Sequence, residues 1–380
     1  MRWKFILGLL TTCAVLMSMS YTMLIPFLPM YLIQDLGVVK ADVDMWSGAI
    51  FAITFLVSGI MAPIWGALAD KKSRKLMALR AGFCLAITYF LGALVSNPWE
   101  LLGVRFIQGL SAGLWPALLA IISVESPKLK LGFCMGVMQG GMTAGGVLGP
   151  LFGGLLADQF GMRMAFFIAA AALFLITLAL FFFVKEEPRK PDPNAKPVKI
   201  WDFSLCKIPA VKRMLICAGV VQLTILMQQP IMPLYVAELQ GSMERIVLIS
   251  GIVFSVTGIS GVLASPVWGI LGQNWGYRPV LYLSLLGAGI FGIVQVFPNS
   301  LEWFTIWRFV GGLAFAGIFP AINAVLTVST NANDKGRVFG LSYLAPLLSK
   351  IICSLTLAST FTVNPGPRKL KVINKPLLIK

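Results

Sequence analysis

Long apolar runs follow one another along almost the whole chain, and they constrain the fold more than any other feature. A membrane-spanning helix needs about 20 mostly apolar residues to cross the ~30 Å hydrocarbon core of a bilayer. Hydropathy predicts ten clear spans, over 5–34, 45–69, 76–96, 101–123, 132–156, 162–184, 213–237, 246–271, 279–297 and 301–329. It indicates an eleventh, less clear span near 338–363. The expected fold class is therefore an all-α polytopic membrane protein with 10–11 spans.

The composition agrees with a membrane protein and excludes several other classes. Of the 380 residues, 58% are hydrophobic and 12% are charged, about half of the ~25% charged share of soluble domains. A net charge of +16 would suggest a nucleic-acid partner in a soluble protein, but here the cations lie in loops and tails, so none is expected. The chain has no histidine, and its six cysteines show no Cys-x-x-Cys spacing. We therefore expect no metal site, no cofactor and no enzymatic centre.

The charged residues of the loops predict the orientation of the spans. Cytoplasmic loops carry an excess of Lys and Arg. Here four cationic segments all fall on one side of the membrane: the N-terminus, the loop after the second span, the loop after the fourth span and the long loop 185–212. The loops on the other side are poor in cations and carry Asp35, Asp42, Asp44, Glu100 and Glu302. We expect the N-terminus and the cationic loops to be cytoplasmic.

The two parts of the chain repeat each other at a nearly constant offset. Pro26, Pro29 and Tyr31 recur as Pro230, Pro233 and Tyr235, and the same register holds for Pro63, Trp65, Gly66, Arg105, Pro116, Gly132 and Gly136, which recur as Pro266, Trp268, Gly269, Arg308, Pro320, Gly336 and Gly340. A set of matches in one register across five spans indicates a duplication. We expect a six-span half over 1–184, a cytoplasmic linker over 185–212 rich in Pro and Lys, and a second half over 213–343.

The loop between the second and third spans, Gly66–Lys75, carries the most specific motif. Its pattern, Gly-x-Leu-Ala-Asp-Lys-x-Ser-Arg-Lys, resembles the loop motif of the major facilitator superfamily. The resemblance implies a fold of two repeated six-span halves, of which the second is incomplete here, with substrate bound between the halves. It also implies a conformational latch of Gly66, Asp70 and Arg74 that joins the halves on the cytoplasmic side. The second-half copy has Gln273 in place of the acid, so a one-sided latch is expected.

Two further motifs favour one branch of that superfamily. Gly145, Gly149 and Gly153 are four residues apart and lie with Pro150 in the fifth span. This pattern resembles the motif that marks drug:proton antiporters, and implies a bendable hinge packed against the opposite half. The alternative is ordinary small-residue packing, which is common in membrane helices.

Arg105 in the fourth span resembles the arginine that the same family links to proton handling. An arginine at mid-bilayer costs at least ~2.5 kcal/mol and needs a partner or a wet cavity; the alternative is that Arg105 reaches the nearby interface. Proton antiport also needs a carboxylate with a shifting pKa, yet no Asp or Glu lies in the middle of a span. Asp35 and Glu238, which close spans one and seven, are the best candidates.

The resemblance places the substrate cavity among spans one, four, seven and ten. Polar and aromatic candidates there share a position inside a predicted span, and they are Tyr21, Tyr31, Gln108, Trp115, Gln222, Gln228, Gln229, Tyr235, Arg308 and Asn323. Amides, aromatic rings and methionines suit bulky amphipathic solutes better than sugars.

These features are most similar to the bacterial multidrug exporters of the drug:proton antiporter family. The resemblance implies a monomeric carrier in the bacterial cytoplasmic membrane that exports small amphipathic molecules, with protons as coupling ion and the lipid bilayer as its surroundings. The alternatives are a metabolite or sugar carrier of the same superfamily and an inactive, truncated carrier.

The C-terminal residues 344–380 depart from the repeat. The equivalents of Gly145, Gly149 and Gly153 would be Ser349, Cys353 and Leu357, and Lys350 interrupts the eleventh span. A basic tail stands where a twelfth span would be. We interpret this atypical C-terminus as the product of a shifted reading frame or a truncated gene.

Overall fold

The computed structural model describes residues 2–23, 28–39, 42–71, 73–185, 204–240, 246–298 and 300–344. Its described elements are all helical. Nine helical stretches of this part are long and apolar enough to cross a membrane; they are Trp3–Met23, Met45–Lys71, Arg74–Leu94, Pro98–Glu125, Lys128–Ala157, Met162–Phe183, Gly251–Trp275, Tyr277–Val294 and Leu301–Val328. The predicted all-α membrane fold is confirmed. The atypical C-terminal residues 345–380 lie outside the described part.

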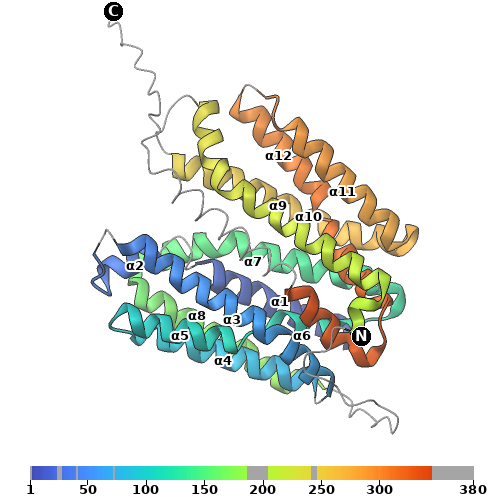
Figure 1. The fold of residues 1–380 in the computed structure, drawn as a ribbon, viewed down its shortest axis with the longest axis horizontal. Coiled ribbons are helices and arrows are strands. Elements are labelled where there is room, and N and C mark those ends of the chain that lie inside the picture. The colour runs from blue at the N-terminus through green and yellow to red at the C-terminus, as the bar shows by residue number, and fades with distance from the viewer. Residues whose placement is uncertain are drawn as a thin grey trace, which may run out of the picture.

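The first half, as we call helices α1 to α8, forms one bundle (Figure 1). Its elements are α1 (Arg2–Met23), α2 (Leu28–Gln34), α3 (Val43–Lys71), α4 (Arg74–Leu94), α5 (Pro98–Leu110), α6 (Leu114–Glu125), α7 (Leu131–Phe160) and α8 (Met162–Phe183), with the short 3-10 turn η2 (Lys128–Lys130) before α7. The predicted first span, 5–34, thus contains two helices, α1 and α2.

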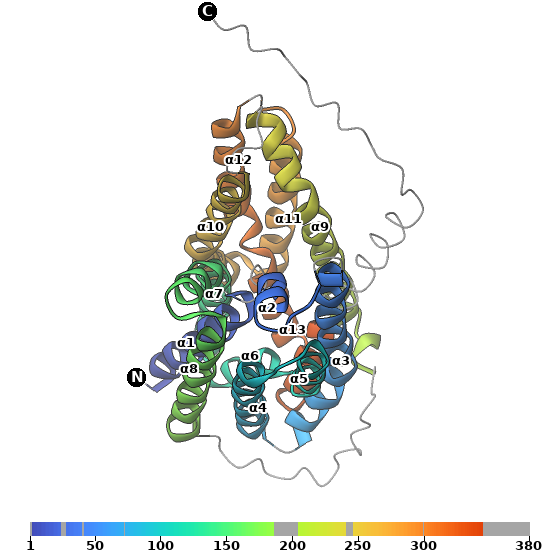
Figure 2. The same ribbon diagram turned by 90° about the vertical axis from the view of Figure 1, so that its left-hand side faces the viewer.

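The second half begins with the 3-10 turn η3 (Ser204–Lys207). It continues through α9 (Pro209–Gln240), α10 (Ile246–Trp275), α11 (Tyr277–Val294), α12 (Leu301–Phe315), α13 (Ile318–Val328) and the 3-10 turn η4 (Ala332–Asp334). Residues 335–344 are again helical; we call them the terminal helix. The 32-residue α9 takes the place of the predicted seventh span. Helix α7 packs along α10 and thereby joins the two halves (Figures 1 and 2).

The predicted fourth and tenth spans are each broken into two helices. Span four breaks between α5 and α6, where Gly113 has a φ of 114°, a value that side-chain-bearing residues rarely adopt. Span ten breaks between α12 and α13, at Ala316 and Gly317. Both predicted spans, 101–123 and 301–329, are therefore present, but each consists of two helices. In each case a proline, Pro116 or Pro320, lies in the first turn of the new helix, where its missing N–H costs no hydrogen bond.

The internal repeat extends to the tertiary contacts. The indole Nε1 of Trp65 donates to the carbonyl of Leu110 at 2.8 Å, and that of Trp268 donates to the carbonyl of Leu313 at 2.6 Å. Each bond joins the last turn of the first helix of a broken span, α5 or α12, to the neighbouring helix, α3 or α10. Since both partners shift by 203 residues, the two halves are built on one packing scheme.

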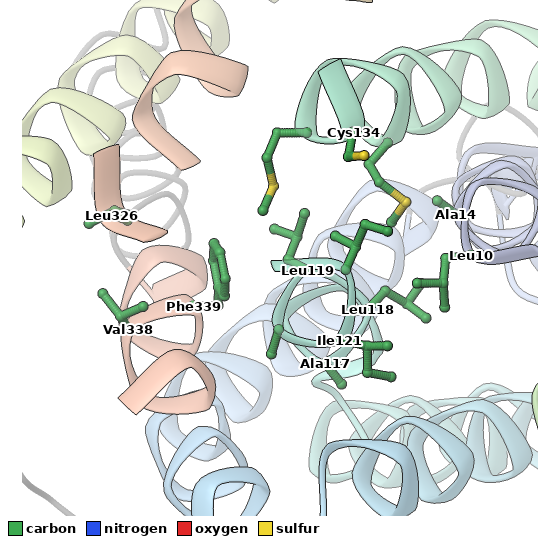
Figure 3. Close-up of a cluster of buried hydrophobic side chains, with 14 of the residues drawn as sticks. Leu10, Ala14, Ala117, Leu118, Leu119, Ile121, Cys134, Leu326, Val338 and Phe339 are labelled. Carbon is green, nitrogen blue, oxygen red and sulfur yellow. The ribbon is translucent and has the colours of Figure 1, made fainter. Parts of the chain in front are cut away.

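A hydrophobic core crosses from one half to the other (Figure 3). Leu118 and Leu119 of α6 lie in it with Leu10 of α1, and Phe339 of the terminal helix points from the second half toward α6. Each of these four side chains is at most 3% exposed. Burial of this kind contributes ~25 cal/mol per Å² of apolar surface, and it holds the halves together on the side where α6 ends.

Candidate functional site

Asp70, at the end of α3, is bound by the backbone of the other half. The amide of Gly336 donates to its Oδ1 at 2.7 Å, and the amide of Arg337 donates to its Oδ2 at 2.6 Å. The Asp70 side chain is 2% exposed, and the guanidinium nitrogens of Arg74 and Arg337 lie 3.9 Å from its oxygens. A carboxylate is favourable at a helix N-terminus because the first amides have no partner within the helix. Asp70 thus caps the terminal helix across the interface.

Two cations complete this contact. Arg74 follows the N-cap Ser73 of α4 and donates to the carbonyl of Ala332 in the other half. Lys335 is 5% exposed, and its Nζ donates to the carbonyls of Thr327 and Thr330 at the end of α13. Burial lowers the pKa of Lys335 to about 8, so it stays mostly protonated at pH 7. A cation at a helix C-terminus stabilises the unpaired carbonyls there.

Glycines bring the two halves into backbone contact at the same end. A methyl group on Gly66 of α3 would lie 2.6 Å from the carbonyl oxygen of Gly336, and Gly340 is also in contact. In the repeated position, Gly269 of α10 packs against Gly132 of α7. Gly66 and Gly269 are equivalent in the repeat, and so are Gly336 and Gly132, so the same contact forms twice with the roles of the two halves exchanged. We call the Asp70 contacts and these two glycine contacts together the gate.

The glycine stripe of the fifth span faces its own half. Gly145 packs on Val15 and Ser18 of α1, and a methyl group on Gly153 would lie 2.7 Å from Met23 of the same helix. Gly149 packs likewise on Met19 and Thr22 of α1. The expectation that this stripe packs against the opposite half was wrong. Pro150 lies within an unbroken α7 and is exposed.

Gly132, Gly136 and Gly140 of α7 instead face the second half. Gly136 packs on Ser265 and Pro266 of α10, and Gly140 packs on Val262. The two stripes lie on different faces of α7 because Gly140 and Gly145 are five residues apart, more than one 3.6-residue turn. Helix α7 therefore holds α1 with one stripe and the opposite half with the other.

A cavity of about 560 Å³ lies at the broken tenth span, mainly in the second half. Helices α9 to α13 line it, together with Gln139 and Thr143 from α7 of the first half. Of the predicted binding residues, Gln228 and Arg308 line this cavity. Apolar side chains and glycines form most of the wall, and no Asp or Glu is among the described residues that line it.

A second cavity, of about 170 Å³, lies at the broken fourth span of the first half. Three of the predicted residues, Tyr21, Gln108 and Trp115, line it with Phe55 and Tyr89. Tyr343 of the terminal helix contributes from the other half. Non-helical backbone at membrane depth is tolerated where it lines a cavity, and breaks of this kind form the substrate sites of other carriers. The two cavities are therefore the candidate binding region.

The other predicted binding residues whose side chains the structure describes line neither cavity. Tyr31 is fully buried and donates to the carbonyl of Gly92 at 2.9 Å, and its repeat partner Tyr235 stacks edge-on against Phe304. Asn323 is buried in α13, and Gln222 lies on α9 outside the cavity wall. The Gln229 side chain lies outside the described residues. Tyr31, Tyr235 and Asn323 are thus packing residues in this conformation.

The residues predicted to handle protons lie apart from one another. Arg105 is 5% exposed and donates to Gln108 at 2.9 Å, so it does not reach the interface. Asp35 follows α2 and pairs with Arg163 at 3.4 Å, and Glu238 is exposed on α9. None of the three is among the residues that line the two cavities.

Arg80 is a residue that the sequence reasoning missed. It lies on α4, where its guanidinium stacks 3.4 Å from the ring centroid of Trp65 and donates to the carbonyl of Ala112 at 2.9 Å. That carbonyl is freed by the break between α5 and α6. The signal was a lone arginine inside an apolar span, which is rare unless it has a function or a partner.

We expect Arg80→Leu to destabilise the broken fourth span. The substitution leaves the Ala112 carbonyl without its donor and removes the cation–π contact, worth ~1–3 and ~1–2 kcal/mol respectively. The melting temperature of the purified protein should fall by several degrees. The melting temperature of Arg80→Lys should lie between those of the wild type and Arg80→Leu, because an ammonium group keeps the charge but cannot stack flat on the indole ring. Unchanged melting of Arg80→Leu would contradict this role.

Comparisons with known proteins agree with this architecture. The sequence model of the Major Facilitator Superfamily matches residues 10–213 and 214–368, so the match continues past residue 343, where the internal repeat ends. An uncharacterised MFS-type transporter, YuxJ of Bacillus subtilis, is 34% identical over 361 residues, which cover 91% of each chain. The multidrug resistance protein MdtG of Salmonella paratyphi A is 34% identical over 343 residues, 89% of this chain and 84% of that protein.

Among solved structures, the human organic anion transporter MFSD10 has the same fold. Its TM-score is 0.74 over 94% of both chains, at 19% sequence identity. The family match, two relatives of 34% identity and the repeated helical halves lead to one conclusion: this chain is a multi-span membrane transporter that belongs to the major facilitator superfamily.

Proposed function

We propose that the chain exports small amphipathic molecules from a bacterial cell by alternating access. The observation that carries this proposal is the pair of mostly apolar cavities at the two broken spans, of about 560 and 170 Å³. The walls of both cavities are mostly apolar and carry a few amide and hydroxyl groups, as is typical of sites that bind small apolar molecules. The name of the relative MdtG, a multidrug resistance protein, supports the same substrate class.

The gate supports a two-state cycle. In this conformation the halves touch through backbone at Gly66 and Gly269, and Asp70 caps a helix of the opposite half. These contacts require the halves to be closed at that end. A rocking movement would break them together and open the cavities to that side, because each cavity is lined by residues of both halves.

We infer that the closed end faces the cytoplasm. The cationic residues Lys71, Arg74 and Lys75 flank Asp70, and the turn η2, which contains Lys128 and Lys130, packs against α10 at the same end. Basic loops of this kind remain on the cytoplasmic side. The N-terminus is then cytoplasmic, and the protein lies in the bacterial cytoplasmic membrane as a monomer.

We propose that protons drive export. The support is the resemblance of Gly145, Gly149, Pro150 and Gly153 to the antiporter motif, together with the buried Arg105 beside Gln108. Of the several acids at the rims of the spans, Asp35 and Glu238, which close spans one and seven, are the candidates for the coupling carboxylate. A facilitator-type carrier for a metabolite is the second candidate, and the lack of an acid among the described cavity-lining residues favours it.

Everted membrane vesicles test export and its coupling together. Vesicles with the protein should concentrate a neutral fluorescent amphiphile when a proton gradient is present, and lose it when an uncoupler collapses the gradient. Vesicles without the protein provide the control. Accumulation equal to the control would overturn export, and transport unaffected by the uncoupler would favour the facilitator.

A further inference from the structure

Arg308 is the charged residue among the described residues that line the larger cavity. It lies in the second turn of α12 and is 8% exposed, so its guanidinium does not extend to the membrane surface. A buried arginine remains charged under all ordinary conditions. The site therefore holds a permanent positive charge in a mostly apolar wall.

The neighbours of Arg308 do not neutralise it. Its Nη1 lies 3.4 Å from Oε1 of Gln295, a long hydrogen bond to a neutral amide, and its guanidinium lies 5.9 Å from the ring centroid of Phe254. Its Nε is buried without a hydrogen-bond partner among the described residues. A buried charge without a counter-charge is costly unless a ligand compensates it.

A second unsatisfied donor lines the same cavity. The hydroxyl of Thr257 on α10 is buried and has no partner among the described residues. An N–H and an O–H group that both lack partners on one wall form a site for an acceptor with several lone pairs. Ionised oxygens form the strongest hydrogen bonds to such donors.

The repeat partner Arg105 shows the contrast. It donates to Gln108 at 2.9 Å and is not among the residues that line the smaller cavity. Both arginines donate to a glutamine and keep one buried nitrogen without a partner among the described residues, Nη2 of Arg105 and Nε of Arg308. They differ in that Arg308 lines a cavity and Arg105 does not. The difference favours a binding role for Arg308.

We propose that Arg308 binds the anionic group of the transported molecule, so that the preferred substrates are organic anions with a carboxylate, sulfonate or phosphonate on an apolar body. This proposal rests on the proposed export function for its physiological meaning. Thr257 donates a further hydrogen bond to the same anionic group. The apolar body lies against the aliphatic and aromatic wall between α9 and α12.

A matched set of ligands tests the proposal without requiring transport. 1-Naphthaleneacetate, its neutral amide and 1-naphthylmethylamine share a ring and differ in charge. Their binding to the full chain is measured by equilibrium dialysis in phosphatidylcholine nanodiscs, which contain no anionic headgroups. We expect the carboxylate to bind at least tenfold more tightly than the amide, and the amine to bind most weakly.

Variants assign the preference to the site. Arg308→Gln should abolish the tenfold preference, Arg308→Lys should keep part of it, and Thr257→Val should reduce it by a smaller factor. Arg213→Gln, which removes an exposed cation at the start of α9, is the control and should leave the preference unchanged. If Arg308→Gln fails to fold, Arg308→Lys and the wild-type ligand order decide.

The outcomes separate the two proposals. Equal binding of the three ligands, a preference for the amine, or a carboxylate preference that survives in Arg308→Gln would overturn the anion site. Carboxylate preference without vesicle accumulation of any amphiphile would support the site and overturn export. Export of neutral amphiphiles without an Arg308-dependent preference would keep export and overturn the anion site.

Discussion

Replacing Asp70 with Asn should lower export at least tenfold while the protein still inserts and folds. The carboxylate accepts backbone hydrogen bonds from Gly336 and Arg337 at 2.7 and 2.6 Å, and an amide can accept through one oxygen only. Hydrogen bonds to charged groups contribute ~1.5–3 kcal/mol each, and ~1.4 kcal/mol changes a conformational equilibrium tenfold. The closed state of the gate would therefore lose most of its population.

The control for this variant is Asp42→Asn. Asp42 is an exposed acid in the loop before α3, at the other end of that helix from Asp70. Its substitution removes the same charge without touching the gate, and export should remain as in the wild type. The rate is measured as accumulation in everted vesicles, normalised to the amount of folded protein. Wild-type export by Asp70→Asn would contradict the role of the gate.

Leucine at Gly149 and at Gly136 should impair the protein in two different ways. At Gly149 the new side chain meets Met19 and Thr22 of α1, within the first half. At Gly136 it meets Ser265 and Pro266 of α10, in the other half. Overpacking of this kind costs ~1–3 kcal/mol or more. Gly149→Leu should therefore lower the melting temperature and the yield, whereas Gly136→Leu should leave the first half folded and lower export at least tenfold.

Gly103→Leu is the matched control, because this glycine of α5 is exposed and a Cβ atom added to it would meet nothing within 4 Å. Its melting temperature and export should equal those of the wild type or exceed them slightly, since glycine is a weak helix former. If all three variants behave alike, the assignment of the two stripes to different helix contacts is wrong.

Much of the fold could be predicted because lipid imposes a simple rule on sequence. Spans must be long and apolar, so hydropathy located the spans, and a constant offset exposed the duplication. The breaks at Gly113 and Gly317 escaped because a hydropathy average cannot see a local change of backbone direction. Their signal was present: each glycine precedes a proline by three residues, Pro116 and Pro320, a pattern that ends one helix and starts another.

The candidate site could be predicted only in part, because residue type does not fix the direction of a side chain. Asp70 was identified from its motif, but its partners are backbone amides near residue 336, which a sequence pattern cannot reveal. Tyr31 and Tyr235 have the composition of a binding site, but Tyr31 is buried between helices and the half-buried Tyr235 packs against Phe304. The contact faces of the α7 glycines depend on angular position around the helix, and spacing alone does not give the neighbour.

The central claim is that the two halves are closed at the Asp70 end and separate there during transport. Spin labels at Leu129 of η2 and Asn331 before η4, both exposed, report the distance between halves in a variant without native cysteines. Double electron–electron resonance in nanodiscs should give one short distance for the parent protein. Asp70→Asn should add a second, longer population. Identical distributions for the two proteins would contradict the claim.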